Sequence, residues 1–94
     1  LHPNYPNPFN PETWIPFQLA QDTVVKLEIF SFDGKLLRTL DLGQLSAGLY
    51  LSQDRAAYWD GRNGTGEDVA SGVYFGVLSV GDNQTYVQRF VMSK

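Results

Sequence analysis

The sequence predicts an all-β fold, an antiparallel β-sandwich of about seven short strands in one domain that spans residues 1–94. Apolar residues alternate with polar ones over much of the chain, which is the period of a half-buried strand. Turn residues recur at spacings of roughly ten residues, as they do in sandwiches. No stretch has the i, i+3, i+4 apolar spacing of an amphipathic helix, and 94 residues allow one domain.

Proline is concentrated at the beginning of the chain, where all five prolines lie within the first 16 residues. Because proline fixes φ and favours extended backbone, residues 1–12 are expected to form an ordered, extended lead-in. Tyr5 and Phe9 give this lead-in two aromatic anchors with which it would cross the surface of the domain. Residues 13–94 are then expected to form the sandwich itself.

The first strand is predicted where Ile15, Phe17 and Leu19 alternate with residues of the opposite face. Pro16 lies inside this strand and has no N–H group to donate to a β-ladder. We therefore expect the strand at the edge of a sheet, or paired on one side only.

Turn residues divide the rest of the chain into strands. Val25, Leu27 and Ile29 alternate with polar neighbours and predict a second strand. Asp33-Gly34 follows it and is a strong hairpin signal, because glycine adopts positive φ without steric cost. The other expected elements are a strand near 36–42, a turn at 43–48, one or two strands over 49–60, a glycine-rich loop at 61–72, a strand at 73–80, a turn at 81–83 and a last strand at 84–92.

Composition and charge exclude several classes of function. The net charge is −3 and the seven basic residues are scattered, whereas a nucleic-acid partner requires a dense Lys/Arg surface. Cysteine is absent, which excludes disulfides and thiolate metal sites. No apolar run approaches the roughly 20 residues of a membrane span. The first residues lack the pattern of a signal peptide, so we expect an intracellular protein or a piece of a longer exported one.

Few side chains in the sequence suit catalysis. His2 is the only histidine and lies near a chain end that is expected to fray, so a nucleophile activated by histidine is not expected. Acidic residues such as Asp22, Asp33 and Asp82 stand in turns, where carboxylates commonly cap the backbone. We therefore expect neither enzymatic activity nor a cofactor.

One acidic loop raises the question of a calcium site. Its oxygen-bearing side chains belong to Asp60, Asn63, Glu67 and Asp68. An EF-hand needs oxygen ligands at fixed loop positions, and Arg62 stands where the second ligand would be. An irregular calcium site is the alternative to the favoured interpretation, in which Asp60 bonds to loop amides and the glycines provide positive φ.

Aromatic residues make up 14% of the chain, and a row of exposed rings would stack on sugars. By strand alternation the outward candidates are Trp14, Tyr58, Phe30 and Phe32. The competing interpretation is that most aromatic rings fill the core or lie under the lead-in. A carbohydrate-binding or adhesive face, with a glycan as partner, therefore stays open as an alternative.

Three segments carry a recognisable combination of motifs. They are NYPNPFNP with TWIPFQL at residues 4–19, VKLEIF with Gly34 and the following RTL at residues 25–40, and WDGR with VASGVYF at residues 59–75. The tail from Arg89 to Lys94 adds two basic residues near the end. Together these segments resemble the C-terminal sorting domains of the type IX secretion system. The same signature is found in domains related to the immunoglobulin-like part of the flagellar hook-capping protein.

The resemblance implies an immunoglobulin/fibronectin-III-like sandwich at the C-terminus of an exported bacterial protein. It implies that an outer-membrane translocon reads this module, and that a sortase-like peptidase removes it while the cargo is attached to the cell surface. The cargo would be a separate N-terminal domain. The expected location is therefore the cell surface or the extracellular space.

The resemblance also assigns roles to individual residues. The recognition candidates are Asn4, Tyr5, Pro6, Asn7, Pro8, Phe9, Arg89 and Lys94. The alternative for the proline segment is that it only seals an open edge of the sandwich. Structural roles are expected for Trp59, Asp60, Gly61, Gly72 and Tyr74. Among these, Gly72 would permit a turn, and Tyr74 would lock a connection as a tyrosine corner does.

Three functions from different classes follow. The first is a non-catalytic sorting and anchoring module. The second is a sugar-binding or adhesive sandwich, and the third is a structural assembly domain like the hook-cap relatives.

Overall fold

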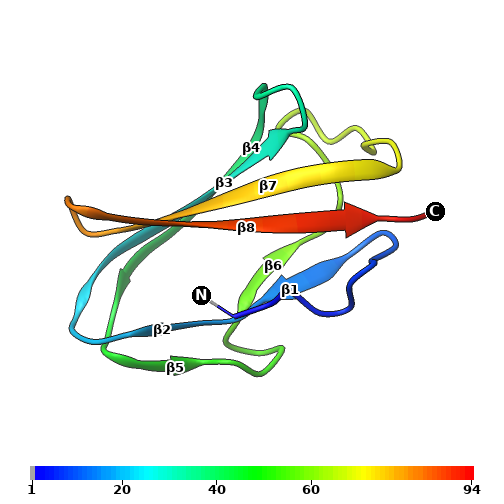
Figure 1. Cartoon of the computed structure of the whole chain (residues 1–94). Helices are drawn as coiled ribbons and strands as arrows, with labels where there is room; N and C mark the ends of the chain where they lie inside the picture. The colour runs from blue at the N-terminus through cyan, green and yellow to red at the C-terminus, as the bar shows by residue number, and fades with distance from the viewer. Residues whose placement is uncertain (1) are drawn as a thin grey trace.

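The computed structural model describes residues 2–94, so Leu1, the first residue of the predicted lead-in, lies outside the described residues. Figure 1 shows an all-β chain, and within the described part no helix is long and apolar enough to span a membrane. The strands are β1 (Thr13–Ile15), β2 (Phe17–Leu19), β3 (Thr23–Ser31), β4 (Leu36–Leu45), β5 (Gly48–Tyr50), β6 (Ala57–Trp59), β7 (Gly72–Val80) and β8 (Gln84–Met92).

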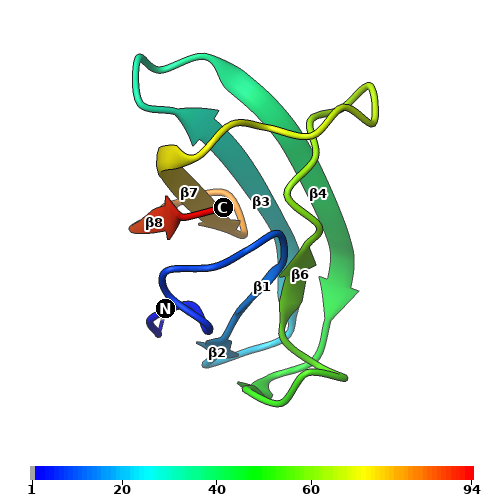
Figure 2. The ribbon, with the colours of Figure 1, turned by 90° about the vertical axis from the view of Figure 1, so that its right-hand side faces the viewer.

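The strands form two facing layers. One layer is a four-stranded antiparallel sheet in the order β4-β3-β7-β8. The other layer consists of two short antiparallel pairs, β1 with β6 and β2 with β5. Figure 2 shows the large sheet curving around these short pairs. The antiparallel sandwich that the two-residue alternation predicts is therefore confirmed.

The strand count is eight rather than seven because Pro16 splits the predicted first strand. Without an N–H group, Pro16 cannot continue a ladder, and the chain changes partner there. Ile15 in β1 still pairs with Ala57 of β6, whereas Phe17 in β2 already pairs with Tyr50 of β5. The second layer thus consists of two short pairs instead of one continuous sheet.

The hairpin from β3 to β4 turns at the predicted Asp33-Gly34, where the Gly34 N–H donates to Ser31 O. The end of β4 differs from the prediction. A turn was expected to begin at Gly43, but β4 continues to Leu45 through a β-bulge. Gly43 has a φ of +74° at this bulge. Glycine is therefore used there to distort the strand and not to end it.

The core lies between the layers and is rich in aromatic side chains. Trp59 is fully buried at its centre, with ring centroids of Phe9 and Tyr74 at 5.5 Å and of Phe90 at 6.4 Å. Edge-to-face and tilted contacts of this kind add to the stabilisation from burial. The other fully buried side chains include Ile15, Phe17, Leu27, Ile29, Leu78 and Met92.

Gly76 on β7 makes room for this aromatic core. A Cβ atom at position 76 would lie 2.5 Å from Cζ of Phe90 and 3.4 Å from a methyl carbon of Leu27. Because protein interiors are close-packed, any side chain at position 76 would compete with the Phe90 ring. The buried position of Phe90 therefore depends on the glycine.

Candidate recognition surface

The lead-in joins the two layers of the sandwich. At its beginning, Tyr5 exchanges two backbone hydrogen bonds with Trp14 of β1, at 2.9 and 2.8 Å. Further along, the Phe9 N–H donates to Val91 O at 2.9 Å, and the Ser93 N–H donates to Phe9 O at 3.0 Å. The lead-in is therefore built into the sheets at both points. The three peptide bonds Tyr5–Pro6, Asn7–Pro8 and Asn10–Pro11 are cis.

The lead-in is not the single extended segment that its prolines predict. Residues 6–8 and 10–11 form bends, and only the bridges at Tyr5 and Phe9 are strand-like. The physical reason is that Tyr5 lies beside β1 in one layer while Phe9 lies beside β8 in the other. A straight segment along either strand would not connect the two.

Two of the recognition candidates lie inside the domain. The exposed fractions of Asn4 and Phe9 are 3% and 1%. The Asn4 Nδ2 group donates to Thr13 Oγ1 at 3.0 Å and to Pro6 O at 3.3 Å, and the Thr13 hydroxyl donates to Pro6 O. In the folded domain Asn4 and Phe9 are out of reach of a partner, and their contacts hold the lead-in in place.

The other candidates in the lead-in lie at or near the surface. Pro6, Asn7 and Pro8 are exposed, and Asn7 Oδ1 accepts a hydrogen bond from the Val91 N–H at 3.3 Å. Tyr5 is half-buried, and its hydroxyl donates to Leu51 O at 2.7 Å. The short stretch of residues 6–8 is thus the part of the lead-in that a partner can contact.

Arg89 and Lys94 are both exposed near the C-terminal end of β8. Arg89 lies opposite Phe75 on β7, and the Lys94 N–H donates to Ser71 Oγ at 3.0 Å. Within residues 2–94, neither side chain forms an ion pair with an acidic side chain. Both charges are therefore available to an anionic group of a partner.

The WDGR segment is held by a residue that sequence reasoning assigned no role. Arg38 of β4 donates from Nη1 to Asp60 Oδ1 at 2.9 Å and to Arg62 O at 3.1 Å. Asp60 Oδ1 also accepts from the Arg62 N–H, and Trp59 Nε1 donates to Arg62 O. In the sequence Arg38 belongs to the RTL motif of the resemblance, which assigned it no contact with the loop.

The oxygen atoms considered for calcium do not converge. Asp60 faces Arg38, and Asp68 pairs with Arg62 at 3.3 Å. The Thr65 hydroxyl and, to a lesser extent, Asn63 Nδ2 donate to the Glu67 carboxylate, and these bonds lower the pKa of Glu67. In the described part of the chain, no three acidic or histidine side chains are grouped as a metal site would require. The hydrogen bonds instead order the loop.

The remaining structural candidates surround the same loop. Gly61 has a φ of +78° and lies against the carbonyl group of Pro11, so a Cβ atom there would overlap the backbone. Gly72 is the first residue of β7. The Tyr74 hydroxyl donates to Ala70 O, four residues earlier, and burial raises the pKa of Tyr74. Tyr74 thereby ties β7 to the connection that precedes it.

The outward aromatic candidates do not form a single row. Trp14 and Tyr58 are neighbours across β1 and β6, with ring centroids 5.4 Å apart. Phe30 and Phe32 belong to the other layer, at and beyond the end of β3, where Phe32 stacks on Phe75 at 6.5 Å. The Tyr58 hydroxyl also donates to the Glu12 carboxylate at 2.6 Å. A long sugar chain would therefore meet at most two of these four rings.

The sequence of residues 11–81 matches the family described as the FlgD Ig-like domain. The chain belongs to the FlgD Ig-like domain family. This places the sandwich among immunoglobulin-like folds, as the motif resemblance implied. No curated protein sequence matches the chain.

Two solved structures are similar to this FlgD Ig-like domain. FlgD from P. aeruginosa has a TM-score of 0.67 and 20% identity, and the match covers 85% of this chain and 60% of that one. Dimeric latent PorU from Porphyromonas gingivalis has a TM-score of 0.62 and 18% identity, covering 96% of this chain and 9% of that one. At these identities the similarity concerns the fold.

The family match leaves out both ends of this FlgD Ig-like domain. It begins at Pro11 and ends at Gly81, so residues 2–10 and residues 82–94, which include strand β8, lie outside it. These two segments contact each other through Phe9, Val91 and Ser93. All of the recognition candidates are located in them.

Proposed function

We propose that this FlgD Ig-like domain is a non-catalytic C-terminal sorting and anchoring module. It would direct an exported bacterial protein through the type IX secretion system to the cell surface. The observation that carries the proposal is the combination of the three motif segments with the two segments outside the family match. Those two segments contain the recognition candidates and meet along β8.

A sorting module must be readable while it is attached to cargo. The PorU structure contains this fold within only 9% of its chain, which is compatible with a small module on a much larger protein. An outer-membrane translocon and a sortase-like peptidase would be the partners, and an N-terminal domain would be the cargo. The exposed residues 6–8 and the cations Arg89 and Lys94 would provide the contacts, since charge-assisted hydrogen bonds are directional.

An export experiment tests the proposal. A fluorescent reporter that carries its own signal peptide is fused to the N-terminus of residues 1–94 and expressed in a bacterium that has the type IX system. We expect the reporter at the cell surface, whereas the reporter without the module stays inside. The proposal is wrong if the fused, folded module leaves the reporter inside the cell.

Recognition by the two cations is tested with substitutions and not with a truncation. Removing the segment after Gln88 would also remove the buried side chains of Phe90 and Met92. The double substitution Arg89→Ser and Lys94→Ser keeps these side chains and should reduce surface display. Lys35→Ser, in an exposed turn, is the matched control and should have no effect.

A structural assembly domain is the second candidate, favoured by the match to 60% of the FlgD chain. An assembly domain should associate with copies of itself or with other subunits. Analytical ultracentrifugation of residues 1–94 over a range of concentrations distinguishes the two functions. Discrete oligomers would favour assembly, whereas a monomer at all concentrations would exclude assembly by self-association.

A further inference from the structure

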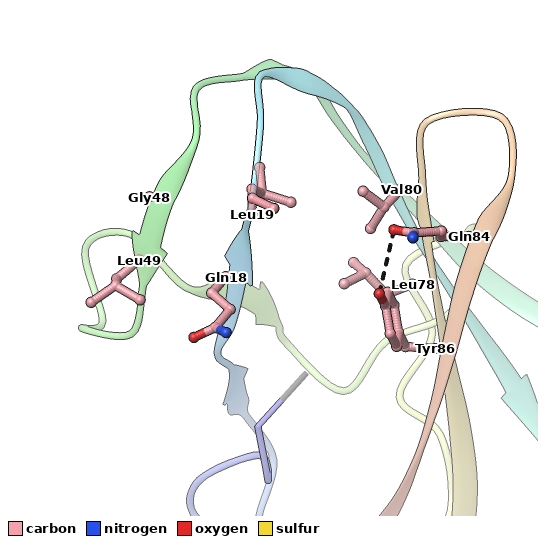
Figure 3. Close-up of a pocket in the computed structure, with 9 residues that line it drawn as sticks. Gln18, Leu19, Gly48, Leu49, Leu78, Val80, Gln84 and Tyr86 are labelled. Carbon is pink, nitrogen blue, oxygen red and sulfur yellow. Dashed lines mark hydrogen bonds between the residues drawn. The ribbon is translucent and has the colours of Figure 1, made fainter.

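A groove opens between the layers at the end where β7 turns into β8 (Figure 3). Its volume is about 470 Å³. The walls are formed by β2 and β5 on one side and by β7 and β8 on the other, with Leu19, Leu49, Leu78, Val80 and Tyr86 as the apolar lining. No charged side chain lines it, and Gln18 and Gln84 are part of its lining. The groove therefore suits apolar side chains that arrive with a backbone able to form hydrogen bonds.

The edge of β8 beside this groove has free backbone groups. β8 pairs with β7 along one edge. The backbone N–H and C=O groups of Val91 bond to the lead-in and therefore point to the other edge. The backbone N–H and C=O groups of successive residues point to opposite edges of a strand. Those of Thr85, Val87 and Arg89 therefore point to the same open edge as those of Val91. Across residues 2–94 only the Gln88 side chain approaches them, at 3.5 Å from Arg89 O.

The same edge already accepts an extended segment a few residues further on. Phe9 of the lead-in bridges to β8 in parallel and bonds to Val91 and Ser93. This pairing stops at Asn7, whose side-chain oxygen accepts the hydrogen bond from the Val91 N–H. Proline lies on either side of Asn7. Proline has no N–H group to offer a ladder, so the lead-in leaves the rest of the edge uncovered.

We propose that the open edge of β8 binds an extended polypeptide segment of a partner protein by strand addition. The backbone of the segment would pair with Thr85, Val87 and Arg89, and its alternate side chains, which are apolar, would enter the groove beside Tyr86. Val87, exposed by 65%, would be covered on the opposite face. The inference rests on the proposed function only for the identity of the protein that supplies the segment.

The binding test uses purified residues 1–94 and a displayed library of random twelve-residue peptides. We expect the enriched peptides to have apolar residues at alternate positions. Their binding should protect the amides of Thr85, Val87 and Arg89 from hydrogen exchange. Failure to enrich any peptide, or enrichment of peptides that leave these amides unprotected, would overturn the proposal.

Two matched variants locate the contact. Val87→Pro removes an N–H group that points away from β7, so the ladder to β7 is kept, whereas Val87→Thr keeps the N–H group. We expect the enriched peptides to bind Val87→Thr as they bind the unmodified domain, and to bind Val87→Pro about tenfold more weakly, the effect of one hydrogen bond. Equal binding to both variants would contradict strand addition at this edge.

Tyr86→Glu is a second variant that tests the same contact if Val87→Pro does not fold. It places a charge in the groove at a side chain that is 43% exposed and should weaken the same peptides. Self-pairing is the competing outcome. If the three amides become protected at high protein concentration without peptide, a second copy occupies the edge and the proposal is wrong. Because none of these measurements involves export, their result is independent of the reporter experiment.

Discussion

The aromatic core packs as it does because residue 76 is a glycine and has no side chain. Gly76→Ala puts a methyl group within 2.5 Å of the Phe90 ring, and overpacking of this kind costs about 1–3 kcal/mol. We expect the free energy of unfolding in urea to fall by that amount. Gly64→Ala is the control, because its new methyl group would meet only Leu37 O at an ordinary 3.6 Å. Equal stability of the two variants would show that Phe90 does not need the space.

The hydroxyl of Tyr74, a residue that is 7% exposed, makes stability depend on alkaline pH. Burial raises its pKa above the ordinary value of 10.0, so above that pH the unfolded chain loses the proton before the folded one does. Stability is therefore complete below pH 10 and falls as the pH rises through the higher folded pKa. Urea titrations between pH 8 and 11 should show this fall. Tyr74→Phe should make it shallower, and an unchanged slope would contradict the assignment.

At the scale of elements, Arg38 joins strand β4 to the WDGR loop. Arg38→Met keeps most of the apolar stem and removes the hydrogen bonds to Asp60 Oδ1 and Arg62 O. Because the pair is about one-third exposed, we expect a loss of only about 1–2 kcal/mol in thermal or urea unfolding. Lys26→Met is the control, since its ion pair with Glu28 spans 3.9 Å at the surface. A loss as small as that of the control would mean that Arg38 does not hold the loop.

The lead-in is expected to unfold together with the sandwich. Phe9→Ala removes a ring that is 1% exposed, and such changes cost about 3–5 kcal/mol. Phe32→Ala removes the same ring from a site that is 75% exposed and should cost far less. Calorimetry of both variants tests this difference. If Phe9→Ala melts like the unmodified domain, the lead-in is an appendage rather than a part of the fold.

Local patterns predict the longer strands well and the interruptions poorly. Alternation places β3 and β7, because each buries alternate residues along one face, whereas in β8 only Phe90 and Met92 at its end are buried. The change of partner at Pro16 depends on where β5 and β6 lie, and the bulge at Gly43 depends on the register with β3. Neither of these long-range relations is encoded in the neighbouring residues.

The same limit explains the candidate recognition surface. Motif resemblance selects residues 4–9 as a group, but burial separates them. Asn4 is internal because it bonds to Thr13, and Phe9 is internal because its ring packs against Phe90, more than 80 positions away in the sequence. The clamp by Arg38 likewise crosses from β4 to a distant loop. Contacts of such long range appear only when the layers are assembled.

At the scale of the whole molecule, the features that the described residues offer to a partner are exposed residues 6–8, the cations Arg89 and Lys94, and the open edge of β8. The two segments outside the family match, residues 2–10 of the lead-in and residues 82–94 with β8, meet at one edge of the large sheet. A partner that reads both would recognise the folded domain and would bind an unfolded chain poorly. This agrees with a module that is read after it has folded.

The central claim is that the domain carries sorting information for the type IX system. The most direct measurement is the fraction of a reporter fused to residues 1–94 that reaches the cell surface, compared between a strain with the system and one in which it is inactivated. We predict surface display in the first strain and retention in the second. The same surface fraction in both strains would contradict the claim.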